Sequence, residues 1–256
     1  MKNELQICTW NIKFGFRLPI ILQTIQYNAD FKNLDFFALQ EASVHNGIED
    51  AEAIARTLGD DYEYFQVSTH VFLKMLQANA LIWNNKRIKI TQKESFLLPR
   101  AHEAKIPRWE KTFLRVIPKQ QRHSLVLEGM FGTRSLRIYV AHLDVLGFTH
   151  RRNQLNTIFL DQQLRSPTDI TCIAGDFNTF KIRKRPSWNA LVEDTKTQGF
   201  VDLTSEINWT FSEPRLRMKQ KLDAIFLKPN TLSYTSWSLD EPGSDHIPVF
   251  ANIVLE

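Results

Sequence analysis

Near the end of the chain, an aspartate and a histidine stand side by side just before an apolar run. Asp245 and His246 precede residues 247–255, whose alternating apolar side chains predict a half-buried β-strand. A histidine can accept a proton near neutral pH, and a neighbouring carboxylate can bind a metal ion or orient the imidazole ring. The pair alone is a weak signal, so its meaning depends on partners elsewhere in the chain.

Other polar residues stand at the carboxyl ends of apolar runs, where a sheet would hold them rigidly. They are Asn11 after residues 7–10, Gln40 and Glu41 after 36–39, His142 and Asp144 after 138–141, Asp176 and Asn178 after 173–175, and Asp223 within 221–226. A turn explains any single aspartate or asparagine of this kind. Because polar groups in a strand-rich core must be satisfied, their repeated placement predicts that they converge on one site.

The elements that must position these residues are short apolar runs, several of them rich in β-branched and aromatic side chains. Strands are predicted at residues 5–12, 35–39, 62–67, 79–83, 88–96, 124–127, 136–141, 170–174, 222–227 and 247–255. Helical periodicity predicts helices at residues 48–58, 152–164 and 187–198. Many strands with few helices predict two packed sheets with the helices outside.

The composition is that of an ordinary globular protein, with 43% hydrophobic and 23% charged residues in a chain of 256. Glycine and proline are scattered and no linker or repeat is found, so one domain over residues 1–256 is expected. No apolar run reaches the roughly 20 residues that span a bilayer. No secretory signal is recognised either, which predicts a cytoplasmic protein. Cys8 and Cys172 lie in apolar runs and are expected to be buried free thiols.

Six segments carry a resemblance to a known family. They are residues 9–12 (Thr-Trp-Asn-Ile), 39–41 (Leu-Gln-Glu), 141–144 (Ala-His-Leu-Asp), 175–179 (Gly-Asp-Phe-Asn-Thr), 222–226 (Leu-Asp-Ala-Ile-Phe) and 244–249 (Ser-Asp-His-Ile-Pro-Val). In type and order they resemble the endonuclease/exonuclease/phosphatase superfamily, which includes deoxyribonuclease I, neutral sphingomyelinases and inositol polyphosphate 5-phosphatases. The resemblance implies an α/β fold of deoxyribonuclease I type, a four-layer sandwich of two mixed β-sheets flanked by helices. It also implies a Mg²⁺-dependent phosphoesterase.

Carried over by resemblance, the metal-binding residues are Glu41 as the main carboxylate, Asn11 beside it, and Asp245 acting through the metal or its water. Ligands that are all oxygens suit a hard cation such as Mg²⁺, with Mn²⁺ as a substitute. Lys13 departs from the pattern, because abasic endonucleases usually carry an acidic residue there. That departure disfavours an abasic-site endonuclease.

The resemblance also implies the catalytic roles. His246 would be the general base, and Asp223 would orient it and stabilise its protonated form. Asp176 and Asn178 would place the attacking water and contact the phosphoryl oxygens, while His142 would stabilise the developing charge. Together they predict in-line attack of an activated water on a phosphoester. Asp176 is also a candidate for the acid that assists the leaving oxygen.

Candidate substrate-binding residues are Asn79 in the segment 77–80 and Arg151 at the start of the predicted helix, although a helix start in solvent would also explain Arg151. Basic clusters at residues 100–122, 181–185 and 215–221 flank the motifs, and they include Arg183, Lys184 and Arg185. Basic residues interleaved with Trp109, Phe113 and Trp188 suit a nucleic acid, although solvated loops and core aromatics would explain them too.

Substrate choice remains open at this stage, with a DNA or RNA nuclease as the first hypothesis. A sphingomyelinase-like phospholipid phosphodiesterase is the second, because the apolar residues 71–76 could touch a membrane surface, although a buried helix or a strand edge would also explain them. A phosphatase of small molecules or inositol phosphates is the third. A catalytically inactive adaptor that binds polyanions is a distant fourth, because a pure binder has no need for the full polar set. A monomer is expected.

Overall fold

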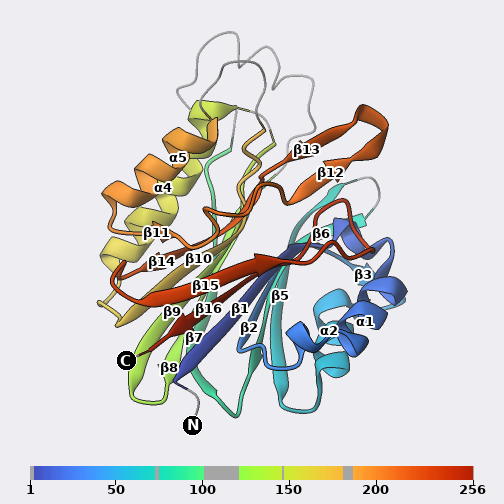
Figure 1. Ribbon diagram of the computed structural model, residues 1–256, viewed down its shortest axis with the longest axis horizontal. Coiled ribbons are helices and arrows are strands. Elements are labelled where there is room, and N and C mark those ends of the chain that lie inside the picture. Colours follow the sequence, from blue (N-terminus) through green and yellow to red (C-terminus); the bar gives the residue numbers. More distant parts are fainter. Residues whose placement is uncertain (1–2, 73–74, 101–120, 146, 181–186, 256) are drawn as a thin grey trace.

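Two six-stranded β-sheets form the centre of the computed structural model, which describes residues 3–72, 75–100, 121–145, 147–180 and 187–255 (Figure 1). In spatial order the first sheet contains β15 (Ser233–Ser238), β16 (Val249–Val254), β1 (Glu4–Asn11), β2 (Phe36–Ala42), β6 (Met75–Asn84) and β5 (Tyr62–Phe72). The second sheet contains β11 (Val201–Asp202), β14 (Asp223–Lys228), β10 (Ile170–Asp176), β9 (Arg134–His142), β8 (His123–Phe131) and β7 (Ile88–Leu97). Both sheets mix parallel and antiparallel pairs.

Helices cover the outer faces of both sheets. On one side α1 (Leu18–Tyr27) and α2 (Asp50–Leu58) pack on the first sheet, and on the other side α4 (Phe148–Leu164) and α5 (Ser187–Thr197) pack on the second (Figure 1). The smaller elements are η1 (Lys13–Gly15), η2 (Ala29–Phe31), η3 (Pro214–Leu216) and the strand pairs β3 (Val44–His45) with β4 (Ile48–Glu49) and β12 (Phe211–Glu213) with β13 (Met218–Gln220). The expected four-layer α/β sandwich is confirmed.

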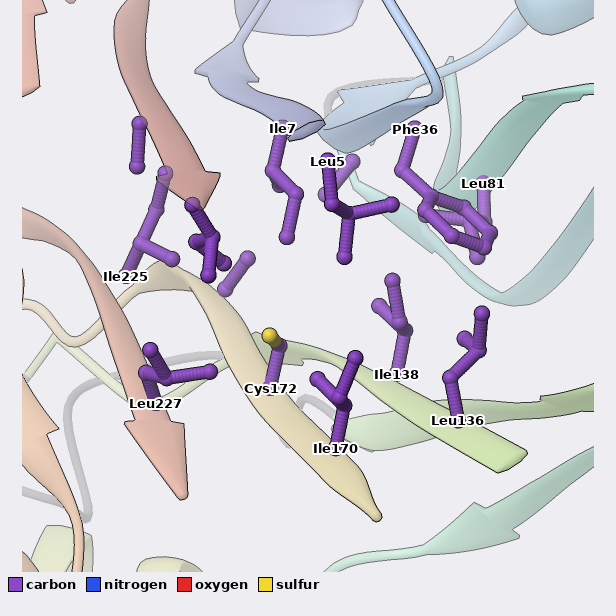
Figure 2. Packing of buried hydrophobic residues seen from close by; sticks show 14 of the residues in the cluster. Leu5, Ile7, Phe36, Leu81, Leu136, Ile138, Ile170, Cys172, Ile225 and Leu227 are labelled. Carbon is purple, nitrogen blue, oxygen red and sulfur yellow. The ribbon is translucent and has the colours of Figure 1, made fainter. Parts of the chain in front are cut away.

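The main core lies between the two sheets. Figure 2 shows Leu5 and Ile7 of β1 facing Ile138 of β9 and Cys172 of β10, and all four are fully buried. Burying an aliphatic side chain of this size stabilises the fold by about 1.5–3 kcal/mol relative to leaving it exposed. Since both cysteines are buried and free, that expectation is confirmed.

At one edge of the second sheet, the apolar residues of its inner face give way to a row of polar residues. The inward residues of β9, β10 and β14 are apolar except at one end of each strand, where His142 and Asp176 close β9 and β10 and Asp223 begins the antiparallel β14. The register pairs Asp176 with His142 on one side and with Asp223 on the other. Because neighbouring strands lie about 4.8 Å apart, the three side chains stand next to one another at one edge of the core.

A β-bulge in β2 brings a carboxylate into the same place from the first sheet. Regular alternation after Phe36 and Ala38 turns Gln40 inward and would turn the next residue outward. Pairing with β6 shifts register between Leu39 and Ala42, and Glu41 has a left-handed φ of 53°. An extra residue of this kind bends the strand and redirects a side chain. Glu41 therefore points toward the second sheet, close to His142.

Several elements differ from the sequence predictions, among them one helix start, one whole helix and one edge strand. The helix expected from residue 48 begins at Asp50, because Ile48–Glu49 pairs with Val44–His45 as a short hairpin. Helix α1 was not predicted, although Pro19 in its first turn was an available signal. The edge strand β15 was not predicted because serines and a threonine surround its two aromatic residues and it is only partly buried. Among the described residues, no helix is long and apolar enough to span a membrane.

Candidate active site

A buried histidine–aspartate pair lies where the two sheets meet. His246 Nδ1 lies 2.7 Å from Asp223 Oδ2, and the side chains are 6% and 0% exposed. The indole Nε1 of Trp10 donates to the backbone carbonyl of His246 at 2.9 Å, which fixes that residue against the first sheet. The edge of the Phe211 ring packs on the imidazole at 5.0 Å between centroids. The pair joins Asp223 of the second sheet to a histidine anchored on the first.

Asp176 occupies the centre of the site. Its Oδ2 accepts a hydrogen bond from Asn11 Nδ2 at 2.9 Å, and its Oδ1 accepts one from the backbone N–H of Asn178 at 2.8 Å. The same Oδ2 lies 3.8 Å from Nε2 of both His142 and His246. One carboxylate oxygen thus faces two imidazole rings without bonding tightly to either.

The walls of the site come from His142 and Glu41. Nε2 of His142 lies 3.7 Å from Glu41 Oε1, which is too long for a hydrogen bond. Gly175, the residue before Asp176, permits this crowding: a Cβ there would lie 1.9 Å from the Ala141 carbonyl oxygen. The close approach of β9 and β10 therefore depends on glycine at this position.

Burial and neighbouring charges shift the pKa values of the titratable side chains in the site. Burial opposes the charged form of His246, but the carboxylates of Asp223 and Asp176 outweigh it and raise the pKa of His246 to about 10. Burial and the charge of Asp223 raise the pKa of Asp176 to about 7. Burial also raises the pKa of Glu41, and burial together with Arg122 holds the pKa of His142 well below its ordinary value. Perturbed groups gathered in one place are typical of catalytic sites.

Hard oxygen donors in the site fit a divalent cation. Glu41 and Asp176 both approach Nε2 of His142, and burial raises the pKa of each carboxyl, so a nearby cation would stabilise the charged form of each. Ligand atoms of Asp176, Asp223 and His246 also lie within 4.8 Å of one another. In that group the short His246–Asp223 contact is better explained as a hydrogen bond than as shared metal ligation.

The predicted metal ligand Asp245 has a different partner in the structure. Its Oδ2 lies 2.7 Å from the ammonium of Lys13, and the backbone N–H of Lys13 donates to Asn11 Oδ1 at 3.0 Å. The lysine that replaces an acidic residue in the motif therefore sits beside the predicted metal ligands. Of the predicted metal-binding carboxylates, Glu41 approaches the row formed by His142, Asp176 and Asp223, since its Oε1 lies 3.7 Å from His142 Nε2.

Comparison with known families agrees with this arrangement. The sequence model described as the endonuclease/exonuclease/phosphatase family matches residues 8–246, nearly the whole chain. The chain belongs to this family. Its members are phosphoesterases, so the protein is a hydrolase acting on phosphoester bonds, and divalent metal ions are the usual cofactor of the family. A search of curated protein sequences found no significant match.

Solved structures show the same fold. An endonuclease/exonuclease/phosphatase from Bacteroides vulgatus matches with a TM-score of 0.72 at 17% identity, covering 99% of each chain. A mannosyl-6-phosphatase from Bacteroides thetaiotaomicron matches with a TM-score of 0.70 at 18% identity, covering 98% of this chain and 99% of that chain. D. rerio TDP2 complexed with a single-strand DNA product matches with a TM-score of 0.69 at 17% identity, covering 98% of each chain.

The core residues predicted from the family motifs come together, and the two described candidates for substrate binding, Asn79 and Arg151, are buried. Asn79 is buried and donates to the carbonyl of His123 at 2.9 Å, and Arg151 is buried and donates to the carbonyl of Val145 at 2.7 Å. The first contact joins β6 to the start of β8, and the second holds the segment between β9 and α4. Arg183, Lys184 and Arg185 lie outside the described residues, as do Trp109 and Phe113.

Two interpretations of basic and aromatic residues are corrected by their packing. Trp188 stacks on Phe226 with ring centroids 6.3 Å apart, so it belongs to the outer core and is not a free stacking platform. Arg122 was counted among the basic residues of a surface segment, yet its side chain is 4% exposed and contacts His142 and Asp144. Asp144 was visible as a strand-end residue, but nothing in the sequence indicated that Arg122 joins it behind His142, because a basic residue in a polar segment has an ordinary surface explanation.

Proposed function

We propose that the protein is a Mg²⁺-dependent phosphodiesterase that hydrolyses nucleic acid, with His246 as the general base. The observation that supports this chemistry best is the buried His246–Asp223 pair, 2.7 Å apart, which faces Asp176 across 3.8 Å. Asp223 accepts the Nδ1 proton, so Nε2 is the nitrogen directed toward the site. Because Asp223 and Asp176 raise the pKa of His246 to about 10 in the metal-free protein, the ring would act as a base near neutral pH only where a bound cation offsets those carboxylate charges. A water held between Nε2 and Asp176 would be oriented for in-line attack on phosphorus.

The remaining site residues have distinct roles in this proposal. Asn11 holds Asp176 through its side-chain amide, and Asn178 holds it through its backbone N–H. Burial and Asp223 raise the pKa of Asp176 to about 7. Because in-line attack places the leaving oxygen on the opposite side of phosphorus from the water that Asp176 holds, Asp176 cannot also protonate the leaving oxygen. His142 would donate from Nε2 to a non-bridging oxygen. Glu41, with Asn11 and Asp245, would hold Mg²⁺, which when bound neutralises charge on the phosphoryl oxygens.

The β12–β13 hairpin, residues 211–220, supports nucleic acid as the substrate. Phe211 at its base packs on His246, while Arg215, Arg217 and Lys219 are exposed along it. Next to the hairpin, the Lys219 ammonium lies 3.6 Å from the centre of the Trp209 ring. Figure 1 shows the hairpin projecting beyond the ends of the sheets. Exposed basic residues beside aromatic rings can contact a phosphate backbone and its bases.

The chemistry is tested by His246→Ala in a substrate panel with Mg²⁺ and with EDTA. The panel contains single-stranded and duplex DNA, RNA, sphingomyelin vesicles, bis-p-nitrophenyl phosphate and the monoester p-nitrophenyl phosphate. The variant should melt as a folded protein and lose metal-dependent turnover on every substrate that the wild-type protein cleaves. Wild-type turnover in the variant, or undiminished turnover in EDTA, would refute the proposed mechanism.

The nucleic-acid assignment has its own test in the hairpin. Arg215→Glu with Arg217→Glu should weaken DNA binding and reduce its dependence on salt, because each lost phosphate contact lowers the slope of log affinity against log salt by about 0.9. The matched control is Lys89→Glu with Arg134→Glu, which makes the same charge change where β7 and β9 begin. Equal losses in both variants would argue against the hairpin as the contact surface.

An exposed apolar hairpin favours a second candidate, a sphingomyelinase-like phospholipid phosphodiesterase. Val71 and Leu76 are paired across β5 and β6, and they are 65% and 39% exposed. Such side chains can enter the headgroup region of a bilayer. Cleavage of sphingomyelin vesicles with intact nucleic acids would select this candidate and leave the proposed chemistry in place. Hydrolysis of small phosphomonoesters alone would select a phosphatase.

A further inference from the structure

The geometry around His142 identifies which of its ring nitrogens carries the proton. Arg122 Nη1 lies 2.9 Å from His142 Nδ1. A guanidinium has only N–H donors and stays protonated in proteins. Nδ1 must therefore be the acceptor with a free lone pair, and in the neutral ring the proton must be on Nε2.

We propose that Arg122 is a positioning residue that fixes His142 as the Nε2–H tautomer, so that the ring offers an N–H donor to the substrate phosphoryl group. The need for that donor rests on the proposed phosphoester hydrolysis. The tautomer itself rests on the Arg122 contact alone. Both side chains are buried, with exposures of 4% and 2%, so water cannot readily replace the guanidinium as the partner of Nδ1.

Arg122 is held in place by a second layer of buried contacts. Its Nε donates to Asp144 Oδ1 at 3.1 Å. The other oxygen of Asp144 lies 2.6 Å from Nε2 of His150 and accepts from Gln154 Nε2 at 3.1 Å. The backbone N–H of Asp144 donates in turn to Gln154 Oε1 at 2.9 Å. These contacts orient the guanidinium and leave Nη1 aimed at the imidazole.

The opposite side of the ring faces the reaction site. Among the described residues, Nε2 of His142 is buried without a hydrogen-bond partner, and Glu41 and Asp176 stay 3.7 and 3.8 Å away. A buried donor without a partner is costly, and such groups are often completed by a ligand. A phosphoryl oxygen placed between these groups would be an acceptor for that N–H. The other tautomer would direct a lone pair at two carboxylates instead.

The tautomer can be measured directly by NMR in the metal-free protein. Long-range ¹H–¹⁵N correlation spectra of ¹⁵N-histidine-labelled protein distinguish Nε2–H from Nδ1–H rings, and the signals of His142 are those lost in His142→Gln. The chain has 7 histidines, which makes assignment by difference practical. We expect Nε2–H for His142 in the wild-type protein. A ring protonated on Nδ1 would overturn the proposal, whatever the enzyme hydrolyses.

Substitutions of Arg122 separate orientation from a purely structural role. Arg122→Met removes every donor at similar length, so the Nδ1–H form should become populated and kcat should fall about 10- to 100-fold. Arg122→Lys keeps a charged donor and should restore both the Nε2–H form and part of the turnover. The control Arg152→Met removes a half-exposed arginine that pairs with Asp194 on the outer helices, and it should change neither.

The outcomes distinguish this inference from the proposed function. Loss of turnover with an unchanged tautomer in Arg122→Met, or equal losses in the Met and Lys variants, would overturn the positioning role. If Arg122→Met does not fold, the wild-type tautomer and Arg122→Lys still decide the matter. A confirmed tautomer in a protein that cleaves no phosphoester would support the role of Arg122 and reject the proposed function.

Discussion

Replacing Asp223 by asparagine should slow phosphoester hydrolysis severely while leaving the fold intact. The change alters no volume, yet it removes the negative charge that lies 2.7 Å from His246 Nδ1. An asparagine can turn its amide toward Nδ1, and that donor would force the ring proton onto Nε2. A ring protonated on Nε2 cannot accept a proton from the attacking water. If the carbonyl faces the ring instead, the imidazolium formed during reaction lacks its counter-charge.

The structure sets the size of the effect. Unit charges 2.7 Å apart attract by about 6 kcal/mol at an effective dielectric constant near 20, and both groups are buried. The corresponding aspartate-to-asparagine change in serine proteases costs about 10⁴ in kcat, which corresponds to about 5.5 kcal/mol. The two magnitudes agree, so Asp223→Asn should reduce kcat by about 10³- to 10⁴-fold.

The assay is Mg²⁺-dependent hydrolysis of bis-p-nitrophenyl phosphate, with thermal melting as the measure of folding. Asp202→Asn is the matched control, because Asp202 is also buried and hydrogen-bonded in the second sheet but contacts Thr204 and Lys221. The control should retain turnover. A loss of less than tenfold in a folded Asp223→Asn variant would refute the role of the histidine–aspartate pair.

Three further predictions follow from the site. NMR titration of the metal-free protein should show His246 losing its proton near pH 10, because Asp223 and Asp176 raise its pKa to about 10; a midpoint near the ordinary value of 6.5 would contradict this. Lys13→Ala should tighten Mn²⁺ binding about two- to fivefold by calorimetry, since it releases a carboxylate from a partly exposed ion pair; unchanged or weaker affinity would contradict the predicted metal site. Gly175→Ala should lose activity and at least about 3 kcal/mol of stability to urea, since its Cβ would meet a backbone oxygen at 1.9 Å. Gly132→Ala, with a similarly unusual φ of 60° but no atom within 4 Å, should cost only about 1–2 kcal/mol; equal costs would reject the steric argument.

Much of the architecture was predictable because a strand that is buried on one or both faces can be recognised from the apolar residues of its own short segment. The strands from β1 to β10 that were predicted from apolar runs all exist, and Asp176 follows one of them as expected. The polar residues of the site could be recognised in the sequence because they stand at strand ends. The strand register that brings them side by side could not, since pairing across the sheet depends on strands far apart in the sequence. The β15 edge strand escaped prediction for a simpler reason: half-exposed serines and threonines look like a loop.

The contacts that tune the site were less predictable. Arg122 looks like an ordinary surface residue in sequence, and although Asp144 stands at a strand end, only the fold places the two together behind His142. The pairing of Lys13 with Asp245 joins residues 232 positions apart. Contacts of this kind depend on side-chain directions set by packing, which composition and periodicity do not record.

Because of the bulge, the number of residues in β2 determines whether the Glu41 side chain reaches the active site. A regular strand offers the interior one side chain in every two residues, whereas β2 offers Gln40 and Glu41 in succession. Deleting one residue between Leu39 and Ala42 would give β2 a more regular ladder with β6. The same deletion would leave room for only one of the two polar side chains at the mouth of the core. The irregular pairing of β2 thus brings Glu41, the proposed metal-binding carboxylate, to the opposite sheet.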